Sequence, residues 1–543
     1  MHYSLSSLLP LSLVPNLLGE VLHLQRERWQ QRTSDTQKLR LSAWLGGASE
    51  RPRQLARIWV ASDYVANVAI EQTDDFLGWL EAGYPHKALN AEAIHADLEV
   101  RIVSVDEDEK AFDQALRLYR RHMMMRILWR DFNRHCELLD TTGEMTHLAE
   151  AVIQASIRFH YSVLAKRFGT PVGKSSGEAQ PLVVLGMGKL GGYELNVSSD
   201  IDLIFAYPES GETVHGPGQP TRRSISNQEF FIKLGQKIIA SLDKVTVDGF
   251  VFRVDMRLRP YGQSGALALN FGALEEYYQT QGRDWERFAM IKARAVSGDC
   301  LPGAQRAGEQ LMSSLRPFTY RKYVDFSAIE SMRAMKGLIN REVQRRGING
   351  DVKLGAGGIR EVEFVVQVFQ MIRGGRDVRL HERQLLKLLP LLDAEGCLPE
   401  GVAARLAQAY VFLRNTEHAL QGYQDKQTQS LPVDAVDQLR LAWVMGFADW
   451  ATFLSQLDQH RMCVQESFQA VIAEPDEAQA EGEDAAGWAP VWLDDLSDDE
   501  LSDALVGQDF DDPLATARAL NGLKKSRALV GMQAEGRKRL DAL

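Results

Sequence analysis

Residues 181–208, PLVVLGMGKLGGYELNVSSDIDLIFAYP, decide the fold. Apolar runs at 182–185 and 203–206 predict two buried strands joined through a glycine-rich turn. Side chains alternate across a strand, so Asp200 and Asp202 are expected on one face and the intervening apolar residues on the other. Two neighbouring carboxylates repel each other unless a cation lies between them, and a glycine turn exposes backbone N–H groups. The stretch therefore predicts a site for a divalent metal and a phosphate.

A second alternating stretch, GFVFRVDMRLRP at 249–260, predicts another half-buried strand. Its polar face is expected to carry Arg253, Asp255, Arg257 and Arg259. If the two strands are neighbours, Asp255 joins the aspartate pair, and three carboxylates suit two-metal displacement at phosphorus. The flanking Arg257 and Arg259 could then hold an anion, because the guanidinium fork binds phosphate in a bidentate way. The alternative for Asp255 is a salt bridge to Arg253 or Arg257.

The glycine spacing also has the form G-x-G-x-x-G, which is typical of dinucleotide-binding folds. That motif must open a helix, yet the sequence reaches Asp200 nine residues after Gly191 and enters a strand again. We therefore reject the dinucleotide interpretation. A second D-x-D, at 509–511, has no glycine turn, and we interpret it as solvated charge.

The candidate site is defined by these motifs. The catalytic and metal-binding candidates are Asp200, Asp202 and Asp255, and the expected cofactor is Mg²⁺, which prefers hard oxygen ligands. The nucleotide- or phosphate-binding candidates are Gly188, Lys189, Gly191, Gly192, Ser199, Arg257 and Arg259.

A separate glycine-rich segment, DVKLGAGGIREVEF at 351–364, precedes a predicted helix. A helix start of this kind can bind an anion, which adds the secondary candidates Lys353, Arg360, Glu361 and Glu363. The alternative is that the acidic residues only favour the helix dipole, and both interpretations stay open.

At 543 residues the chain is too long for a single core, so several domains are expected. The predicted domains are a helical N-terminal region (1–175), a catalytic domain (176–300), a helical bundle (301–473), an acidic linker (474–512) and the start of a further helical segment (513–543). We expect that last segment to be cut inside a longer chain.

Helical periodicity is clearest in six segments: 112–139, 227–242, 326–346, 359–372, 402–421 and 450–472. The first of these has an arginine-rich side. We interpret it as a core helix whose arginines bridge to acidic neighbours, in preference to a surface for an acidic partner or a phosphate.

The composition, 45% apolar and 25% charged, is typical of a soluble globular protein, and no apolar run is long enough to span a membrane. Four cysteines show no metal spacing and fit the reducing cytoplasm. The net charge of −11 is concentrated in 474–512, which holds fifteen acidic residues and no Lys or Arg, so the remainder carries +4. A charge this small does not favour nucleic-acid binding.

Four motifs carry a resemblance to a known family: GMGKLGGYELNVSSDIDLIF, GFVFRVDMRLRPYGQSG, QGRDWERFAMIKAR and KLGAGGIREVEFVVQVFQ. Together they resemble the bifunctional glutamine synthetase adenylyltransferase/adenylyl-removing enzymes, over roughly residues 100–473. That family has two nucleotidyltransferase domains of the DNA polymerase β superfamily in one chain. The N-terminal domain removes AMP from a tyrosine of glutamine synthetase by phosphorolysis, and the C-terminal domain attaches AMP from ATP. This sequence has one such constellation and resembles the N-terminal half.

The resemblance implies a mainly α fold with an embedded α/β nucleotidyltransferase domain of the DNA polymerase β type. It also implies that Asp200, Asp202 and Asp255 are the metal-binding carboxylates. The implied partners are glutamine synthetase, the PII signal protein in its uridylylated form and inorganic phosphate, in the cytoplasm, with no nucleic acid and no membrane.

Two alternative functions stay open. One is an adenylyltransferase that adds AMP from ATP to a protein tyrosine. The other is a non-catalytic regulatory module that binds PII, against which the three converging acids argue. The local chemistry alone does not choose the direction of transfer.

Overall fold

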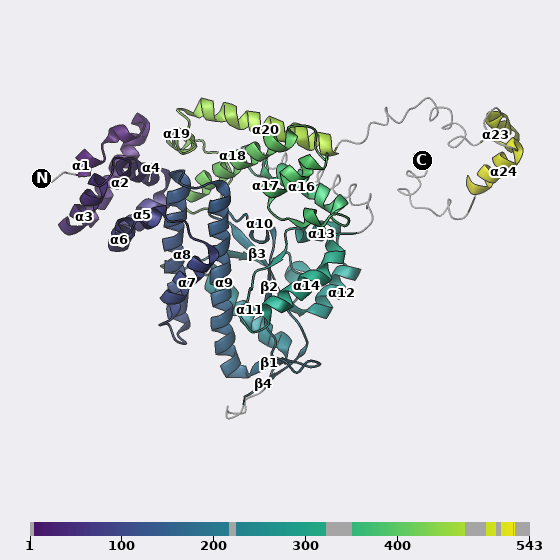
Figure 1. Ribbon diagram of the computed structural model, residues 1–543, viewed down its shortest axis with the longest axis horizontal. Helices are drawn as coiled ribbons and strands as arrows, with labels where there is room; N and C mark the ends of the chain where they lie inside the picture. Colours follow the sequence, from purple (N-terminus) through teal and green to yellow (C-terminus); the bar gives the residue numbers. More distant parts are fainter. Residues whose placement is uncertain are drawn as a thin grey trace. The chain divides into compact units, whose positions relative to one another are not determined.

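Strand β3 (Asp200–Tyr207) is the central strand of a five-stranded sheet in the computed structural model (Figure 1). On one side it pairs antiparallel with β2 (Val183–Gly186), and β2 in turn pairs with β7 (Arg294–Ala295). On the other side β3 runs parallel to β5 (Arg253–Asp255) at its start and to β6 (Ala268–Asn270) at its end. Both strands predicted around the glycine turn are confirmed, and the third lies directly beside the aspartates.

The structure describes residues 5–216, 224–321, 350–472, 496–506, 512–524 and 526. Contacts divide the chain into two compact units, 1–468 and 469–543, which we treat separately. The helix predicted at 326–346 lies outside the described residues, as does the D-x-D at 509–511. The domain boundaries drawn at 175 and 300 stay predictions.

The two faces of β3 are buried under different helices. Ile204 and Ala206 belong to a hydrophobic cluster with β2, α12 (Phe271–Thr280) and α14 (Ala304–Thr319). Phe205, on the opposite face, packs closely against α11 (Asn227–Asp243), where the absence of a side chain at Gly235 makes room for its ring. Asp200 and Asp202 lie on the same face of β3 as Ile204 and Ala206. This face is therefore polar at the start of the strand and part of the hydrophobic core further along.

The strand predicted at 249–260 is wrong beyond Asp255. Only Arg253–Asp255 pairs with β3, and the chain then turns. The Arg259 guanidinium donates to the backbone carbonyls of Met256, Gln263 and Gly265, which holds the turn closed. Polar and apolar residues alternate in sequence up to residue 260, but the strand itself ends at Asp255.

Helix α8 (Glu109–Phe132) ends before the predicted boundary, and α9 (Leu138–Phe168) begins after a turn at which Arg134 has a positive φ. The prediction of one helix over 112–139 is thus wrong at its end. The interpretation is confirmed for Arg120 and Arg126: Arg120 forms a buried ion pair with Asp425 at 2.6 Å, and Arg126 forms one with Glu144 at 2.5 Å.

The other helical predictions within the described residues are confirmed by α11, α16 (Ile359–Arg373), α18 (Val402–Gly422) and α20 (Trp450–Ile472). The remaining helices of the first unit are α1 (Leu5–Leu8), α2 (Asn16–Arg32), α3 (Asp35–Gly46), α4 (Arg51–Ala61), α5 (Asp63–Glu71), α6 (Thr73–Glu81), α7 (Ala91–Ile102), α10 (Gly188–Gly191), α13 (Asp284–Met290), α17 (Leu385–Ala394) and α19 (Ala435–Val444), with short 3-10 turns at Leu11–Leu13, Tyr84–His86, Gly262–Ser264 and Val378–His381. Figure 1 shows α8 and α9 side by side next to the sheet, and α16, α17 and α18 grouped at the end of the sheet where β3 begins.

A second, two-stranded sheet interrupts the region predicted to be helical up to residue 175. Strand β1 (Thr170–Gly173) follows α9 directly and pairs antiparallel with β4 (Gly211–Val214). The change of direction occurs at Gly169, whose φ of 88° ends the helix. A side chain there would also clash with the backbone of Val214, so glycine is required twice over.

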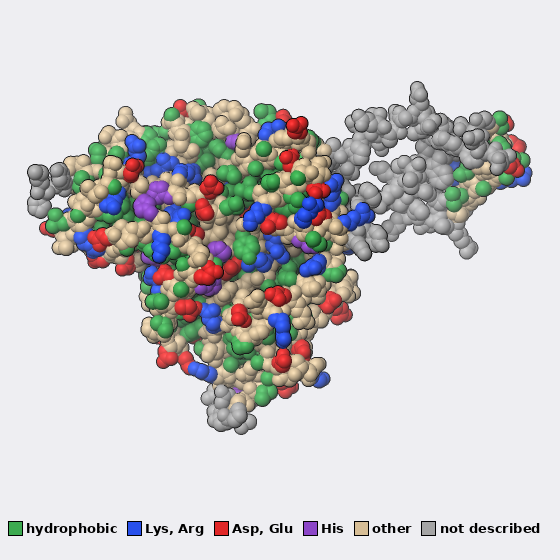
Figure 2. All heavy atoms as spheres, viewed as in Figure 1, with side chains coloured by type: hydrophobic (Ala, Val, Ile, Leu, Met, Phe, Trp, Pro, Cys, Tyr) green, Lys and Arg blue, Asp and Glu red, His purple; other side chains and the backbone are tan. Residues whose placement is uncertain are grey.

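The second unit contains α23 (Asp498–Leu505) and α24 (Pro513–Lys524). Helix α23 lies inside the segment predicted to be an acidic linker, so part of that segment is helical. A capping box between Ser497 and Glu500 starts the helix, and its leucines pack against Ala517. None of the helices built from the described residues is long and apolar enough to cross a membrane. Figure 2 shows Lys, Arg, Asp and Glu side chains intermixed over the visible face of the first unit.

Candidate functional site

The register between β3 and β5 brings the three predicted carboxylates together. Asp202 is the partner of Asp255 in the parallel pairing, and Asp200 is the partner of Arg253. Side chains at the same level of neighbouring strands point to the same face, so Asp202 and Asp255 are side by side. Asp200 lies on that face two residues earlier. From the sequence, this cluster was expected only if the two strands were neighbours. The structure shows that they are.

The Asp202 carboxyl is the most strongly perturbed of the three. Burial, followed by the charges of Asp200 and Asp255, raises its pKa to about 7. Gly188 has a φ of 54°, and a Cβ atom at that position would lie 3.4 Å from the Asp202 Oδ2 atom. The glycine turn thus passes directly beside a carboxylate that has negative neighbours.

Asp255 is held by Arg257, in the turn that follows β5. Arg257 donates to it from Nε at 2.7 Å and from Nη2 at 2.5 Å, and its backbone N–H donates at 2.8 Å. The Arg257 side chain lowers the pKa of the Asp255 carboxyl. This is the salt bridge that stood as the alternative interpretation of Asp255. Arg257 itself is 70% exposed, so its guanidinium can still meet an anion from solvent.

Asp200 is held from a distant part of the chain. The Gln427 side-chain amide donates to Asp200 Oδ1 at 2.6 Å. Gln427 follows α18, and no local signal in the sequence pairs it with the aspartate motif. Only the packing of α18 against the segment that contains the central sheet reveals it.

Helix α18 presents a polar stripe to the loop between the glycine turn and β3. Arg414 donates to the Glu194 carbonyl and to Asn196 Oδ1, each at 2.6 Å. Gln421 accepts from the Ser198 N–H at 3.2 Å. Residues 414, 417 and 421 are spaced by three and four, which places them on one face of the helix. A spacing count over α18 could have suggested this stripe, although not its partner.

Lys189 does not extend into open solvent as a free phosphate-binding amine. Its Nζ lies 3.0 Å from Glu417 Oε2, and the two side chains are 10% and 0% exposed. Burial, opposed in part by Glu417, lowers the pKa of Lys189 to about 7. Glu417 has the reverse balance: burial alone would raise its pKa, but Lys189, Lys353 and Arg414 lower it to about 2. With three cations around it, we hold Glu417 to be ionised.

A second buried ion cluster continues from this pair. Lys292 lies 2.7 Å from Glu194 and 3.2 Å from Glu363. Burial would raise the pKa of Glu363, but Lys292 and then Lys189 lower it to about 2. Of the four secondary candidates, Glu363 therefore joins the network behind the glycine turn.

The other three secondary candidates lie at the start of α16. Glu361 accepts from the Gly357 N–H at 2.9 Å and so closes the helix start. Lys353 contributes positive charge at Asp202 as well as at Glu417, which places it between the carboxylates and the buried network. Arg360 is exposed at the surface of the helix.

The remaining glycine candidates have packing reasons of their own. A Cβ atom at Gly191 would lie 1.8 Å from the carbonyl oxygen of Lys292, which excludes every other residue. At Gly192 the nearest atom would be Glu194 Oε2, at 3.4 Å. Ser199 is half-buried immediately before Asp200. These positions form the turn, and a contact with a ligand stays a prediction for them.

The donor chemistry of the site fits a divalent cation. Carboxylate oxygens are the ligands that Mg²⁺ prefers, and the raised pKa of Asp202 marks a cluster that an added positive charge would relieve. Within the described ranges, however, no three His, Cys, Asp or Glu side chains are arranged to hold a metal ion. We attribute this to the two restraints just described, because Asp255 faces Arg257 and Asp200 faces Gln427. Binding would require Asp255 to exchange Arg257 for the cation.

Two family models match the sequence. Residues 52–328 match glutamate-ammonia ligase adenylyltransferase, and residues 333–472 match GlnD PII-uridylyltransferase. The first match covers the N-terminal helices from α4 onward and all five strands of the central sheet.

Curated relatives cover nearly the whole chain. Bifunctional glutamine synthetase adenylyltransferase/adenylyl-removing enzymes from Pseudomonas aeruginosa and Pseudomonas putida are 48% and 47% identical, over 93% and 97% of this chain. The enzyme of the same name from Hahella chejuensis is 48% identical over 90% of it. The matches include 50%, 53% and 49% of those relatives, so the chain spans about half their length.

Proposed function

The chain belongs to the glutamate-ammonia ligase adenylyltransferase family, and from that premise we propose that it removes AMP from the adenylylated tyrosine of glutamine synthetase by phosphorolysis. In this proposal the chain is the adenylyl-removing half of the bifunctional enzymes it resembles. The products are ADP and the unmodified tyrosine. The matched share of the relatives, about half, supports a single functional half.

One observation carries the proposal: the pairing of β3 with β5 sets Asp202 level with Asp255, next to a glycine turn. Three carboxylates at one end of a nucleotidyltransferase-like sheet have a use in transferring an adenylyl group. A pure binding module has no need of them, and the cluster is electrostatically costly, as the pKa of Asp202 shows.

Asp200, Asp202 and Asp255 would hold Mg²⁺. When bound, Mg²⁺ polarises phosphoryl oxygens and neutralises the charge that develops on the entering and leaving oxygens. The chain's own residues keep the carboxylates in place: Gln427 fixes Asp200, and the loop held by Arg414 and Gln421 fixes the start of β3.

Arg257 is the residue best placed to meet the incoming phosphate. Its guanidinium is exposed, and it borders the carboxylate face through Asp255. Asp255 would bind the cation in place of Arg257, and the Arg257 guanidinium would then be available to hold the phosphate. An oxygen of inorganic phosphate then attacks the adenylyl phosphorus, the bond to the tyrosine oxygen breaks, and that oxygen takes up a proton. The attacking phosphate becomes the β-phosphoryl group of ADP.

The proposed partners follow from the same premise. Glutamine synthetase is the protein substrate, named in the curated relatives. The match of 333–472 to a PII-uridylyltransferase supports control by the PII signal protein, in its uridylylated form. We place the reaction in the cytoplasm, without nucleic acid or membrane.

The alternative, addition of AMP from ATP, uses the same carboxylates. Two assays in parallel separate them: AMP-modified glutamine synthetase with phosphate, and unmodified glutamine synthetase with ATP, each with Mg²⁺ and uridylylated PII. We expect turnover in the first and not in the second. Turnover in the second alone would assign the chain to addition, and binding of PII without turnover in either would assign it to regulation.

A further inference from the structure

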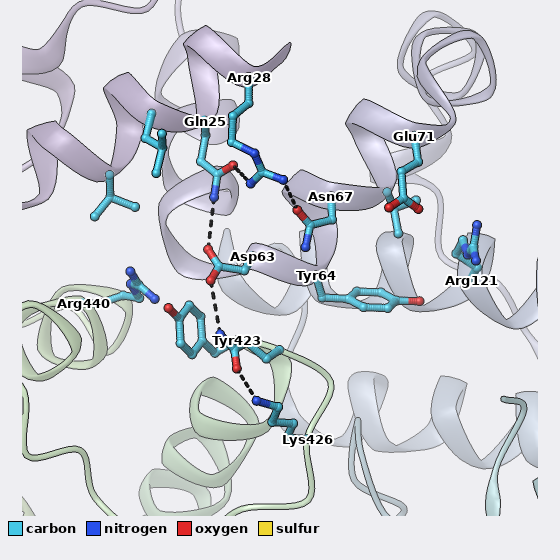
Figure 3. A pocket seen from close by; sticks show the side chains of 14 residues that line it. Gln25, Arg28, Asp63, Tyr64, Asn67, Glu71, Arg121, Tyr423, Lys426 and Arg440 are labelled. Atoms are coloured by element: carbon cyan, nitrogen blue, oxygen red, sulfur yellow. Dashed lines mark hydrogen bonds between the residues drawn. The ribbon is translucent and has the colours of Figure 1, made fainter. Parts of the chain in front are cut away.

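A cavity of about 590 Å³ lies away from the carboxylates, between the N-terminal helices and the segment after α18 (Figure 3). Its wall is formed by α2, α5 and α8 on one side and by residues 423–426 and α19 on the other. Cavities that bind small molecules are of this size. All of the lining residues belong to the first unit of the chain.

A chain of hydrogen bonds crosses this cavity and fixes its polar groups. Arg28 donates to Gln25 at 2.9 Å, and Gln25 donates to Asp63 at 3.1 Å. From the other end, Lys426 donates to Gln424 at 2.6 Å, and Gln424 donates to Asp63 at 3.4 Å. Figure 3 shows these contacts running from α2 through Asp63 to the segment after α18. Both ends of the chain are cations.

The positive charge in the cavity exceeds the negative charge. Four cations line it against two carboxylates, Asp63 and Glu71. Arg440 is paired with Asp437 at 3.3 Å and lies over the Tyr423 ring. Within the described part of the chain no carboxylate forms an ion pair with Arg28, Arg121 or Lys426, although Arg28 and Lys426 have neutral amide partners.

The wall also has apolar surface. Val21, Leu24 and Val68 contribute aliphatic groups, and Leu24 is 57% exposed. The Tyr64 side chain also lines the cavity and extends toward Arg121 (Figure 3). Burial raises the pKa of Tyr64 to about 12, so its hydroxyl stays protonated and able to donate a hydrogen bond. Cations that have no ion-pair partner, next to aliphatic and aromatic surface, match a ligand with acidic groups on an apolar body.

We propose that this cavity binds a small organic anion of nucleotide size, carrying phosphate or carboxylate groups, and that Arg121 and Lys426 are its main contacts. The site is separate from the Asp200–Asp202–Asp255 face and does not depend on the reaction assigned to that face.

The cavity is joined to the carboxylates by a short segment. Asp425, in this segment, is buried and accepts two hydrogen bonds from Arg120, at 2.6 and 2.8 Å, which hold the segment in place. Lys426 belongs to the cavity, and the next residue, Gln427, donates to Asp200. A ligand that draws Lys426 away from Gln424 therefore displaces the residue that orients Asp200. This coupling, unlike binding itself, rests on the proposed role of Asp200.

The binding test uses the full chain, titrated calorimetrically in EDTA, where a metal-dependent nucleotide site is disabled. The probes are ATP, citrate and inorganic tripolyphosphate. We expect ATP or citrate to bind, and whichever binds more tightly identifies phosphate or carboxylate as the recognised group. The double variant Arg121→Ala/Lys426→Ala should weaken binding at least about tenfold, since it removes two charge-assisted contacts. The matched variant Lys110→Ala/Arg405→Ala, with two exposed cations removed elsewhere, should bind as the wild type does.

The outcomes separate the claims. The site is overturned if neither ATP nor citrate binds, or if the site variant and the control variant bind equally well with unchanged melting temperatures. Tripolyphosphate binding as tightly as ATP and citrate overturns the contribution of the apolar wall.

For the coupling, the ligand should change the Mg²⁺ dependence of turnover in the wild-type chain and not in Gln427→Ala. Binding without that change overturns the coupling alone. A chain without any turnover contradicts the proposed function, while the titration in EDTA still decides the site.

Discussion

The Gln427 amide donates a hydrogen bond of 2.6 Å to the carboxylate of Asp200, across more than two hundred residues of sequence. Asp200 is the first residue of the central strand β3. Gln427 follows helix α18, which also holds the loop that precedes β3 through Arg414 and Gln421. The helical bundle thus positions the carboxylates of the candidate site as well as covering it.

Replacing Gln427 by alanine should weaken the apparent affinity for Mg²⁺ by about 10- to 100-fold, because residues that orient metal-binding carboxylates have effects of that size. The measurement is the Mg²⁺ dependence of turnover. Gln408→Ala, an exposed glutamine on α18, is the matched control and should leave it unchanged. An unaltered Mg²⁺ dependence in Gln427→Ala would show that this contact has no orienting role.

Asp202→Asn and Asp200→Asn should each reduce turnover by at least about 10³-fold, comparable to the removal of a central electrostatic group. The folded state should survive, since Asp202→Asn relieves repulsion among the three acids. Thermal unfolding alongside the activity assay checks both points. Asp393→Asn, on the surface of α17, serves as the control. Retained activity in either site variant would refute its assignment.

The two arginines of the β5 segment should behave differently. Arg257→Ala should raise KM for phosphate about tenfold, because its exposed guanidinium is free to meet the anion once Asp255 turns away. Arg259→Ala should instead lower stability by about 1–3 kcal/mol, since it leaves backbone carbonyls in the turn without their donor. Phosphate saturation curves and chemical denaturation measure the two effects. A KM for phosphate that Arg257→Ala leaves unchanged would restrict Arg257 to a salt bridge.

Glu417→Gln should destabilise the chain by about 3–5 kcal/mol, the usual cost of breaking a buried ion pair. The carboxylate is fully buried between Lys189 and Arg414, and its loss leaves buried positive charge uncompensated. Denaturant unfolding measures the change, with the exposed Glu400→Gln as the control. Equal stability of the two variants would mean that the pair at Glu417 is energetically neutral.

Stability should also depend on pH through His160, which lies outside the site. Burial lowers its pKa to about 4, and the ring contacts Ser241 Oγ at 2.7 Å. Between about pH 6.5 and 4 the unfolded chain therefore binds a proton that the folded chain does not, and the stability due to this group is lost as pH falls. The loss is up to about 3 kcal/mol. His160→Gln should lose less stability than the wild type between pH 7.5 and 4, as followed by unfolding at each pH; parallel curves would contradict a buried neutral histidine.

The strands and the aspartate motif were predictable because their signals are local. Apolar runs on either side of a glycine turn, with Asp200 and Asp202 at alternate positions, allow few other structures. The parallel pairing that brings Asp255 next to these two aspartates could be stated only as a condition, and it is present in the structure.

What the sequence could not provide are the contacts made across long distances. Lys189 was assigned to phosphate from its place in the turn, but its partner Glu417 belongs to a helix far along the chain. The alternation of 249–260 was misleading for a local reason, because Arg259 bonds to backbone carbonyls three to six residues away and closes a turn after Asp255. In both cases a polar side chain found a partner that no local pattern specifies.

The most direct test of the central claim follows the phosphate. The chain is incubated with AMP-modified glutamine synthetase, Mg²⁺, uridylylated PII and ³²P-labelled inorganic phosphate. Our account predicts ADP labelled in its β-phosphoryl group, in amounts equal to the tyrosine that is released. Unlabelled AMP as the product, or no release of nucleotide under any of these conditions, would contradict phosphorolysis at the Asp200–Asp202–Asp255 face.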